Sequence, residues 1–444
     1  MKATAAPMAS TAVAAPRHLG LFATTAVVVA SMVGTGVFTT TGFLLADLRS
    51  GTWVLLAWLA GGVLAACGAL SYGALASAIP ESGGEYVFLS RTLHPAVGYL
   101  AGWVSLTAGF AAPLASAAIA FGHYTAPFLP GVPPAVTSVV ILSLAALLHA
   151  VSTHHGSRIH SWVVVCELVL IVSLALFGLS RARCPFSVTL ADPVVPFPMA
   201  DFAVSLVWVS FSYAGWNAAV YIGGEVKDPQ RTLPRALLLG TGFTTVLYLL
   251  LNTAFVRAGH PALFAGKLEV GQVAAVLWGG PMLGTLVSAL VALALAASIS
   301  ALTFTGPRVV GRMAQDGYLP HWLAPATTKP PRHSIILILL LSLVLVATAT
   351  YQHLLTYIGV LLGLSNAATV VGLFRLKKAQ PALPVAGWPF VPALFLVMVA
   401  WMVAFTVYRK PIESLVGAAT LIVGLLAYHL QARGNTNRFK TTAT

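Results

Sequence analysis

Long apolar runs separated by short polar segments constrain this chain more than any other feature. A helix needs about 20 apolar residues to cross the roughly 30 Å hydrocarbon core of a bilayer. Runs of this length recur from near residue 19 to near residue 431. Only 8% of the 444 residues are charged, whereas soluble domains carry about 25%. The sequence therefore predicts an all-α polytopic membrane protein.

The hydropathy pattern predicts twelve transmembrane helices. They lie near residues 19–46, 52–78, 95–123, 134–151, 158–180, 201–224, 233–256, 279–312, 334–350, 353–376, 388–408 and 412–431. The connecting segments are short, so we expect no appended soluble domain. Residues 1–17 are rich in Ala, Thr and Pro, predict a disordered tail and lack the pattern of a signal peptide. Residues 432–444 form a second predicted tail.

The formal net charge of +13 follows a topological pattern. If the N-terminus lies inside, seventeen of the 24 lysines and arginines fall in inner segments. Cytoplasmic loops of membrane proteins carry such an excess of basic residues. The pattern therefore predicts that both termini are cytoplasmic, and it gives no indication of nucleic-acid binding.

Two of the predicted spans carry helix-breaking features at corresponding positions. The first span contains "SMVGTGVF", Ser31 to Phe38, although each glycine costs a helix interior about 1 kcal/mol relative to alanine. The sixth span contains "WVSFSYAGWNAAVYIGGE", Trp208 to Glu225. The two spans correspond if the chain consists of two five-helix halves, and such a pair of interruptions points to a transporter binding site.

An opened helix in a bilayer leaves peptide groups that need partners inside a cavity. A zwitterionic ligand supplies them, because its carboxylate accepts from the N–H groups that begin one half-helix and its ammonium donates to the carbonyls that end the other. The alternative reading is that Gly34 and Gly36 only allow close helix packing.

Four stretches of the chain resemble the amino acid–polyamine–organocation (APC) transporters, especially L-type amino-acid transporters and their bacterial relatives. The stretches are "VGTGVF", "IPESGGEYVFLSR" (79–91), "FSYAGWNAAVYIGGEVKDPQRTLPRA" (211–236) and "GPRVVGRMAQDGYLP" (306–320). The resemblance covers about residues 18–430 and implies a LeuT-like fold with broken helices 1 and 6. It implies a first inverted repeat over 18–180, a second over 201–378, two extra helices over 388–431, and a bacterial-type inner membrane.

The resemblance also implies alternating-access transport of amino acids and a set of substrate-binding residues. These are Met32, Gly34, Thr35, Gly36, Phe211, Ser212, Ala214, Asn217 and Tyr248. Backbone groups of the Gly-Thr-Gly triplet would hold the substrate carboxylate, with the Thr35 hydroxyl assisting; the family usually has serine there. Carbonyls of Met32 and of the second break would receive the ammonium. Phe211 would be an outer gate, and Asn217 and Tyr248 would shape the side-chain pocket.

Glu167 lies deep in the fifth span, within "SWVVVCELVLIVSLAL". An ionisable residue at this depth is by default functional, and many APC relatives carry a lysine here. Our hypothesis is that Glu167 couples transport to a proton gradient, with Ser298, Ser300 and the backbone near Val33 as partners. A sodium site at Glu167 and Ser298, or a permanently protonated structural carboxyl, are the alternatives.

The leading function is a secondary transporter of neutral L-amino acids, since no acidic residue is evident in the expected pocket. The alternatives are an amino-acid exchanger, an organic amine or polyamine transporter and, remotely, an intramembrane enzyme. We expect no cofactor and no metal site, because His154, His155 and His160 have no Cys or carboxylate close by in sequence. Expected partners are the amino-acid substrate and lipid. No accessory subunit is indicated, because no lone cysteine lies near the loop between spans 3 and 4.

Overall fold

The computed structural model describes residues 17–81, 83–151, 156–181, 197–315, 319–324 and 330–441. In this part of the chain the named elements are all helical. The α-helices are α1 Leu21–Met32, α2 Gly36–Leu48, α3 Gly51–Ala78, α4 Glu85–Thr92, α5 Pro95–Val104, α6 Ala112–Thr125, α7 Pro134–Val151, α8 Gly156–Ser180, α10 Met199–Ser212, α11 Pro229–Ala258, α12 Val270–Gly279, α13 Pro281–Gln315, α14 Arg332–Thr348, α15 Tyr351–Ala379, α16 Phe390–Arg409 and α17 Pro411–Thr441. A π-helix, η1 Ser105–Ala111, joins α5 to α6. The 3-10 helices are η2 Ala126–Phe128, η3 Ala218–Glu225, η4 Pro261–Leu263 and η5 His321–Leu323.

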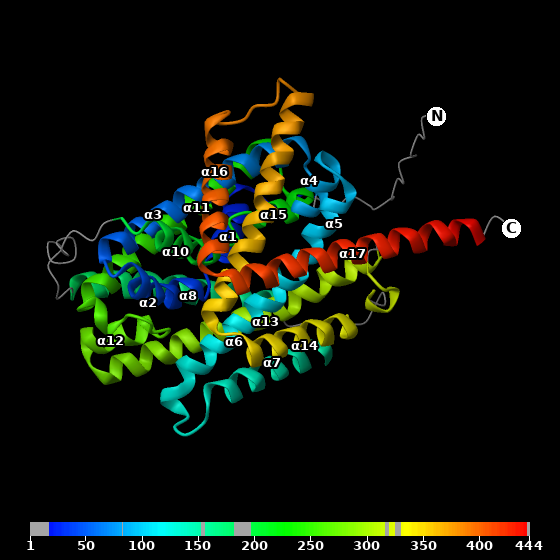
Figure 1. Cartoon of the computed structure of the whole chain (residues 1–444). Coiled ribbons are helices and arrows are strands. Elements are labelled where there is room, and N and C mark those ends of the chain that lie inside the picture. The colour runs from blue at the N-terminus through cyan, green and yellow to red at the C-terminus, as the bar shows by residue number, and fades with distance from the viewer. Residues whose placement is uncertain are drawn as a thin grey trace.

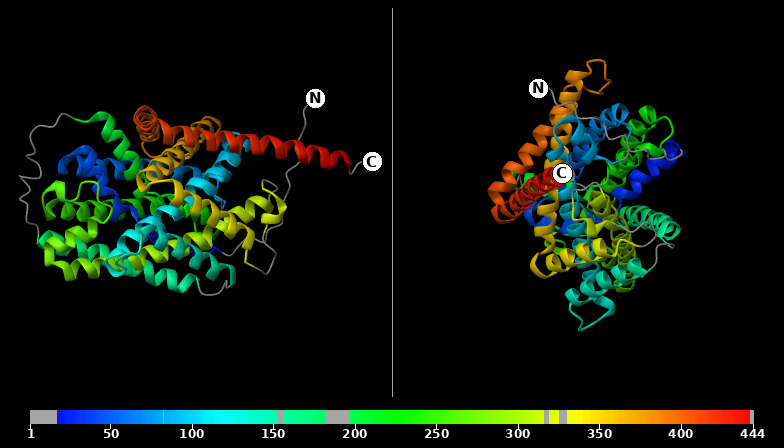
Figure 2. Two further views of the ribbon diagram at one scale, coloured as in Figure 1. Left: turned by 60° about the horizontal axis from the view of Figure 1, so that its bottom comes forward. Right: turned by 90° about the vertical axis from the view of Figure 1, so that its right-hand side faces the viewer.

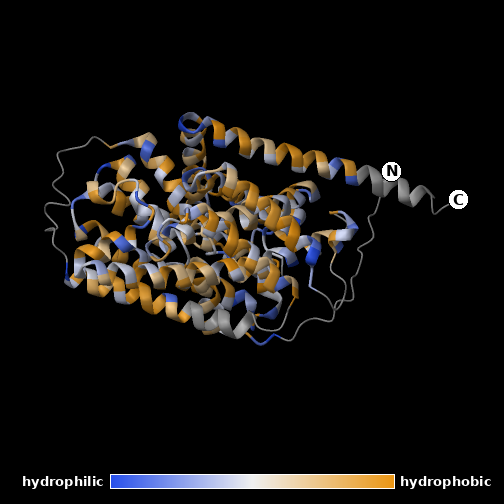
Figure 3. Cartoon of the chain, turned by 90° about the horizontal axis from the view of Figure 1, so that it is seen from below, coloured by the Kyte–Doolittle hydropathy of each residue, from blue (hydrophilic) through white to orange (hydrophobic). Residues whose placement is uncertain are grey.

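The helices agree with a chain that crosses a membrane several times. Among the described residues, eight helical spans are long and apolar enough to cross a membrane. The bent pair α1–α2 makes a ninth if it is counted as one span. The other three predicted spans coincide with shorter apolar helices, Val165–Ser180, Met199–Ser212 and Arg332–Thr348. Figure 3 shows apolar residues along the lengths of the helices, α17 included. The prediction of an all-helical polytopic membrane protein is confirmed.

Hydropathy did not predict every helix. The short helices α4 and α12 lie in or beside segments expected to be loops, because neither is long enough to cross a bilayer. Helix α17 continues to Thr441, into the segment expected to be a tail. The tail prediction for residues 1–16, and the predictions for His154 and His155, lie outside the described residues.

Helices α1, α2, α3, α10 and α11 pack against one another, and several of the largest buried aromatic side chains lie on them and at the end of α10. Trp58, Tyr72, Trp208, Tyr213 and Tyr248 are each at most 1% exposed. Helices α7 and α14 pack along one edge, and α17 runs along the outside of the bundle (Figures 1 and 2). Residues that are far apart in the sequence therefore meet where α1, α2, α3, α10 and α11 pack together.

Small residues allow the central helices to approach closely. Gly62 and Gly73 of α3 lie against Thr245 and Pro234 of α11, and a Cβ on Gly73 would come within 2.9 Å of the Pro234 Cα. Such glycines are typical of helix contacts inside membranes. They allow α11 to pack directly against α3, and α3 in turn contributes lining residues to the cavity described next.

Candidate substrate-binding site

The first transmembrane helix is broken at the glycine triplet. Helix α1 ends at Met32 and α2 begins at Gly36, and the two axes differ by 45°. Val33 has extended backbone angles, φ −70° and ψ 118°. The N–H groups in the first turn of α2 and the last carbonyls of α1 have no partner within their own helices. This stretch therefore presents donors and acceptors in the middle of an apolar span.

A second break follows α10. This helix ends at Ser212, the next residues form turns, and the 3-10 helix η3 begins at Ala218. Gly215 has φ +102°, a conformation that side chains other than glycine rarely adopt. The Ala214 N–H donates to the Phe211 carbonyl (2.9 Å), and the Tyr213 N–H is shared between the Phe211 and Val209 carbonyls.

The two breaks touch one another. A Cβ on Gly215 would lie 2.6 Å from the carbonyl carbon of Ser31, and a Cβ on Gly36 would lie 2.7 Å from the Ser212 Cα. Real Cβ atoms do not approach other atoms so closely. Glycine is therefore required at both positions, because the backbones of α1–α2 and of the second break are in contact there.

A cavity of about 580 Å³ opens beside the two breaks, a volume typical of small-molecule sites. Ten of the predicted residues line it: Met32, Gly34, Thr35, Gly36, Glu167, Phe211, Ser212, Ala214, Asn217 and Ser298. The remaining wall is formed by residues of α3, α4, η1, α6, η3, α13, α15 and α16 and is largely apolar. The structure thus brings together most of the residues that the sequence analysis selected, although the role of each stays a prediction.

Two predicted residues lie elsewhere. Tyr248 is fully buried outside the cavity lining, and its hydroxyl donates to the Met32 carbonyl (2.6 Å), so it supports the break instead of shaping the pocket. Ser300 Oγ lies 2.9 Å from His149 Nε2 and Ser300 is not part of the cavity lining, so its expected pairing with Glu167 stays a prediction that this contact does not support. Two residues along a helix correspond to about 200° of rotation, and Ser298 and Ser300 therefore point to different neighbours.

The cavity contains two carboxylates, which corrects the expectation that its lining has no acidic residue. Among the described lining residues, Glu85 and Glu167 are acidic and none is basic. Both are buried, 6% and 5% exposed. The sequence analysis missed Glu85, because it begins a short helix of mixed polarity, EYVFLSRT, in a segment expected to be a loop.

Three side chains donate hydrogen bonds to Glu85. The Tyr72 hydroxyl donates to Oε1 (3.1 Å), the Asn217 amide also donates to Oε1, and the Tyr221 hydroxyl donates to Oε2. Asn217 therefore contacts the cavity while its amide is held by Glu85.

Aromatic side chains fill the space between the helices on the side of the cavity that faces the C-terminal end of α2. Phe43 stacks on Tyr351 with ring centroids 5.8 Å apart and meets Trp208 edge-on at 6.4 Å. Thr39 Oγ1 and the Tyr351 hydroxyl are 2.6 Å apart. The cavity instead extends along α1 toward its N-terminal end, where Val27 and Ala30 line it.

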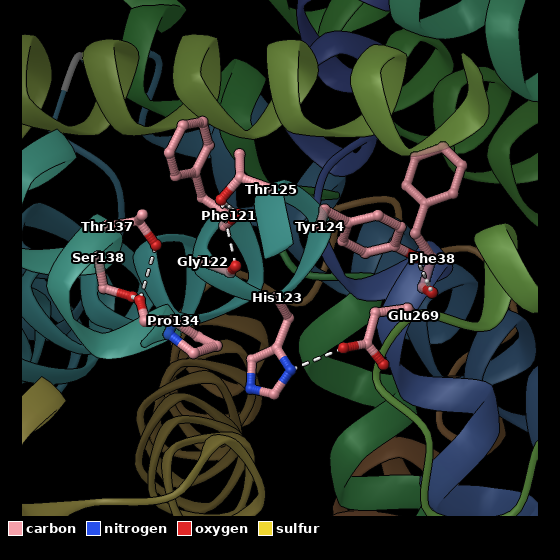
Figure 4. Close-up of polar contacts among 10 residues, drawn as sticks. All are labelled: Phe38, Phe121, Gly122, His123, Tyr124, Thr125, Pro134, Thr137, Ser138 and Glu269. Atoms are coloured by element: carbon pink, nitrogen blue, oxygen red, sulfur yellow. Dashed lines mark hydrogen bonds and ion pairs between the residues drawn. The ribbon is translucent and has the colours of Figure 1, made fainter. Parts of the chain in front are cut away.

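The segment before α12 is tied to the end of α6 by a half-exposed ion pair. His123 Nδ1 and Glu269 Oε1 are 2.7 Å apart, and the neighbouring Tyr124 hydroxyl donates to the Phe38 carbonyl of α2 (3.0 Å) (Figure 4). Burial alone would raise the pKa of Glu269, but the hydrogen bond to His123, a backbone hydrogen bond and the charges of His123 and Lys267 together outweigh burial, and the pKa is lowered. The contact links α2, α6 and the α12 segment.

The chain is similar to known amino-acid transporters over nearly its whole length. The sequence profile of a family described as "Amino acid permease" matches residues 19–426. "Large neutral amino acids transporter small subunit 2" of Mus musculus is 25% identical, covering 94% of this chain and 81% of that protein. "Asc-type amino acid transporter 1" of Homo sapiens is 26% identical, with 96% and 84% covered. "b(0,+)-type amino acid transporter 1" of Mus musculus is 26% identical, with 93% and 88% covered.

These names overturn one expectation. The sequence analysis found no indication of an accessory subunit, but a relative of 25% identity is named as the small subunit of a transporter. Such a name describes one component of a larger assembly. The expectation rested on the cysteine pattern alone, and the absence of a lone cysteine in one loop says nothing about non-covalent association.

Proposed function

Because the chain belongs to the amino acid permease family of the APC superfamily, we propose that it carries neutral L-amino acids across the membrane by alternating access. The relatives are amino-acid transporters by name, and the expectation that the chain is not an enzyme is confirmed. The observation that carries the proposal is the contact between the two helix breaks at the wall of one cavity.

The chemistry of the breaks suits a zwitterion. The N-terminus of α2 directs N–H groups and the positive end of a helix dipole toward Gly34 and Thr35, where a carboxylate would bind. Carbonyls of Met32 and Phe211 would receive the ammonium. Phe211 lines the cavity beside this position, where its ring would close over the substrate as a gate.

A neutral side chain suits the remaining walls. Leu64, Leu362, Phe395 and Val399 line the cavity away from the breaks. Glu85 already accepts hydrogen bonds from three neighbouring side chains, so most of its acceptor capacity is used within the protein and is not offered to a lysine or arginine side chain. An apolar amino acid would bury its side chain here at a gain of about 25 cal/mol per Å².

The proposal includes twelve spans built as two inverted five-helix repeats, residues 18–180 and 201–378, followed by helices over 388–431. Four pairs of helices at corresponding places pack against each other, an arrangement that supports two halves related by a two-fold axis within the membrane. The contacting pairs are α2 with α10, α3 with α11, α6 with α13, and α7 with α14. The short helices α4 and α12 also follow the corresponding spans α3 and α11.

Glu167 would couple transport to protons. Its side chain is buried and lines the cavity together with Ser298. A carboxylate that is exposed to water in one conformation and to apolar surroundings in another changes its proton affinity between them. A sodium ion held by Glu167, Ser298 and carbonyls of the first break, and a permanently protonated carboxyl, are the competing roles.

The proposed topology places both termini in the cytoplasm of a bacterial-type inner membrane. The cavity then opens to the cytoplasm, because it extends toward the N-terminal end of α1 while Phe43 and Tyr351 fill the opposite side. This conformation would be the inward-facing state.

Two measurements test the function. Purified protein is screened by thermal shift against the twenty amino acids and common amines, since a ligand of the folded state raises the unfolding temperature. Proteoliposomes are then assayed for uptake with and without internal amino acid. A proton symporter accumulates neutral amino acids without internal substrate when an inward proton gradient is applied. Uptake that requires internal substrate identifies an exchanger, and stabilisation by amines alone contradicts the proposal.

A further inference from the structure

Glu85 is buried at the wall of the cavity by an unusual local backbone. It begins α4 directly after Gly83 and Gly84, which have φ +136° and +59°. A Cβ on Gly84 would lie 2.7 Å from Cδ1 of Tyr221. The two glycines therefore turn the chain sharply inward and leave room for the Tyr221 ring beside the Glu85 carboxylate.

The donors to Glu85 come mainly from the segment that follows the second helix break. Asn217 immediately precedes η3 and Tyr221 lies within it, and each donates to a different carboxylate oxygen. Tyr72 of α3 supplies the third hydrogen bond, 3.1 Å long. Hydrogen bonds from neutral donors to an ionised carboxylate are about twice as strong as those between neutral groups.

Tyr72 extends the network to α15. Its hydroxyl oxygen lies 2.9 Å from the side-chain oxygen of Asn366. A tyrosine hydroxyl has a single hydrogen, so when Tyr72 donates to Glu85 the Asn366 amide turns its N–H toward Tyr72. One carboxylate thus connects α3, α4, α15 and the opened part of the sixth span.

We propose that Glu85 is a positioning residue for transport, which holds the segment from Asn217 to Tyr221 in the place where it completes the cavity wall. This inference rests on the proposed function. Only a carboxylate accepts from all three donors, because it has no hydrogen of its own when ionised. A glutamine of the same shape would direct an N–H toward one of the donors, which must then turn to accept, and it would replace the stronger hydrogen bonds to a charged oxygen by weaker neutral ones, so the segment is held less firmly.

The test measures amino-acid uptake by the full chain in proteoliposomes. We expect Glu85→Gln to reduce uptake at low substrate concentration at least tenfold, mainly through a higher KM, because the cavity wall is displaced. Adding Asn217→Asp restores most of the uptake, because the glutamine amide can donate to the new carboxylate across the same contact. A residue with a purely structural role would lower the yield of folded protein and leave KM unchanged.

Glu81→Gln is the matched control. Glu81 lies four residues earlier in the same segment, but it is exposed and pairs with Arg91 at 2.6 Å. Its replacement leaves KM unchanged. Unaltered KM in Glu85→Gln, or no recovery in the double variant, overturns the proposal.

If Glu85→Gln does not fold, Tyr221→Phe decides the question, since it removes a single donor. A severalfold higher KM supports the proposal and a normal KM overturns it. Failure of the unaltered chain to transport or bind any amino acid instead rejects the proposed function, so the two failures are distinguishable.

Discussion

Gly36 at the start of α2 lies directly against Ser212, the last residue of α10. A Cβ on Gly36 would sit 2.7 Å from the Ser212 Cα, a distance that neither backbone can relieve without moving. Gly34, two residues earlier, has no atom within 4 Å of its Cβ position. The two glycines of the triplet therefore have different functions. Gly36 allows the two broken helices to meet, and Gly34 leaves open space at the cavity.

Replacing each glycine by alanine separates these functions. Gly36→Ala is expected to destabilise the protein by about 1–3 kcal/mol, the usual cost of overpacking, and to abolish transport. Gly34→Ala keeps the unfolding temperature close to that of the unaltered protein and raises KM, because the methyl group occupies substrate space. Thermal unfolding and uptake measured on both variants check this, and equal loss of stability in the two would contradict it.

Replacing Glu167 by Gln removes the only acid of α8 among its described side chains and mimics the protonated form. If Glu167 carries the coupled proton, uptake by Glu167→Gln no longer increases under an inward proton gradient. The control is Cys166→Ser on the same helix, whose side chain is exposed outside the bundle and whose replacement retains the pH response. An unchanged pH profile in Glu167→Gln would remove the coupling role.

Replacing Tyr248 by Phe tests whether the Tyr248 hydroxyl stabilises the break between α1 and α2. Without the hydroxyl, the Met32 carbonyl loses its buried donor, and an unsatisfied buried group costs about 1–3 kcal/mol. We expect a lower unfolding temperature together with a higher KM, since the carbonyl belongs to the proposed ammonium site. Tyr357→Phe is the control, because it removes only a hydroxyl contact with Thr420 at 3.0 Å; its KM stays normal.

The contact between His123 and Glu269 predicts a specific response to acid. A carboxyl group whose pKa is lowered by folding stabilises the protein above its unfolded-state pKa, and this contribution is lost as the pH falls through the lower folded-state value. The ordinary pKa of Glu269 is 4.5 and the folded value is below it. Unfolding temperatures measured between pH 7 and pH 3.5 should therefore fall less steeply in Glu269→Gln.

Glu225→Gln serves as the control for this series. The Glu225 carboxylate lies 4.0 Å from His18 with both side chains well exposed, and surface pairs of this kind contribute little. We expect its acid response to match that of the unaltered protein. Identical responses in all three proteins would show that the His123 contact has no stabilising role.

The sequence alone determined the class of protein and the positions of the two breaks. Apolar length and glycine content are properties of consecutive residues. The helix breaks at "VGTGVF" and around Gly215 could therefore be predicted without knowing which residues pack against them. The bounds of most long helices followed for the same reason, although α17 continues to Thr441, into the predicted tail. Most of the predicted cavity residues came from the resemblance to the APC transporters, and ten of them line the cavity.

Tertiary structure decided which distant side chains meet. Ser300 pairs with His149 and Tyr248 supports Met32 from behind, since the rotation of a helix about its axis depends on packing around it. Glu85 became part of the cavity only because α4 folds inward against Asn217, more than a hundred residues away in the chain. Such contacts depend on how the whole bundle packs, and no local pattern of residues contains that information.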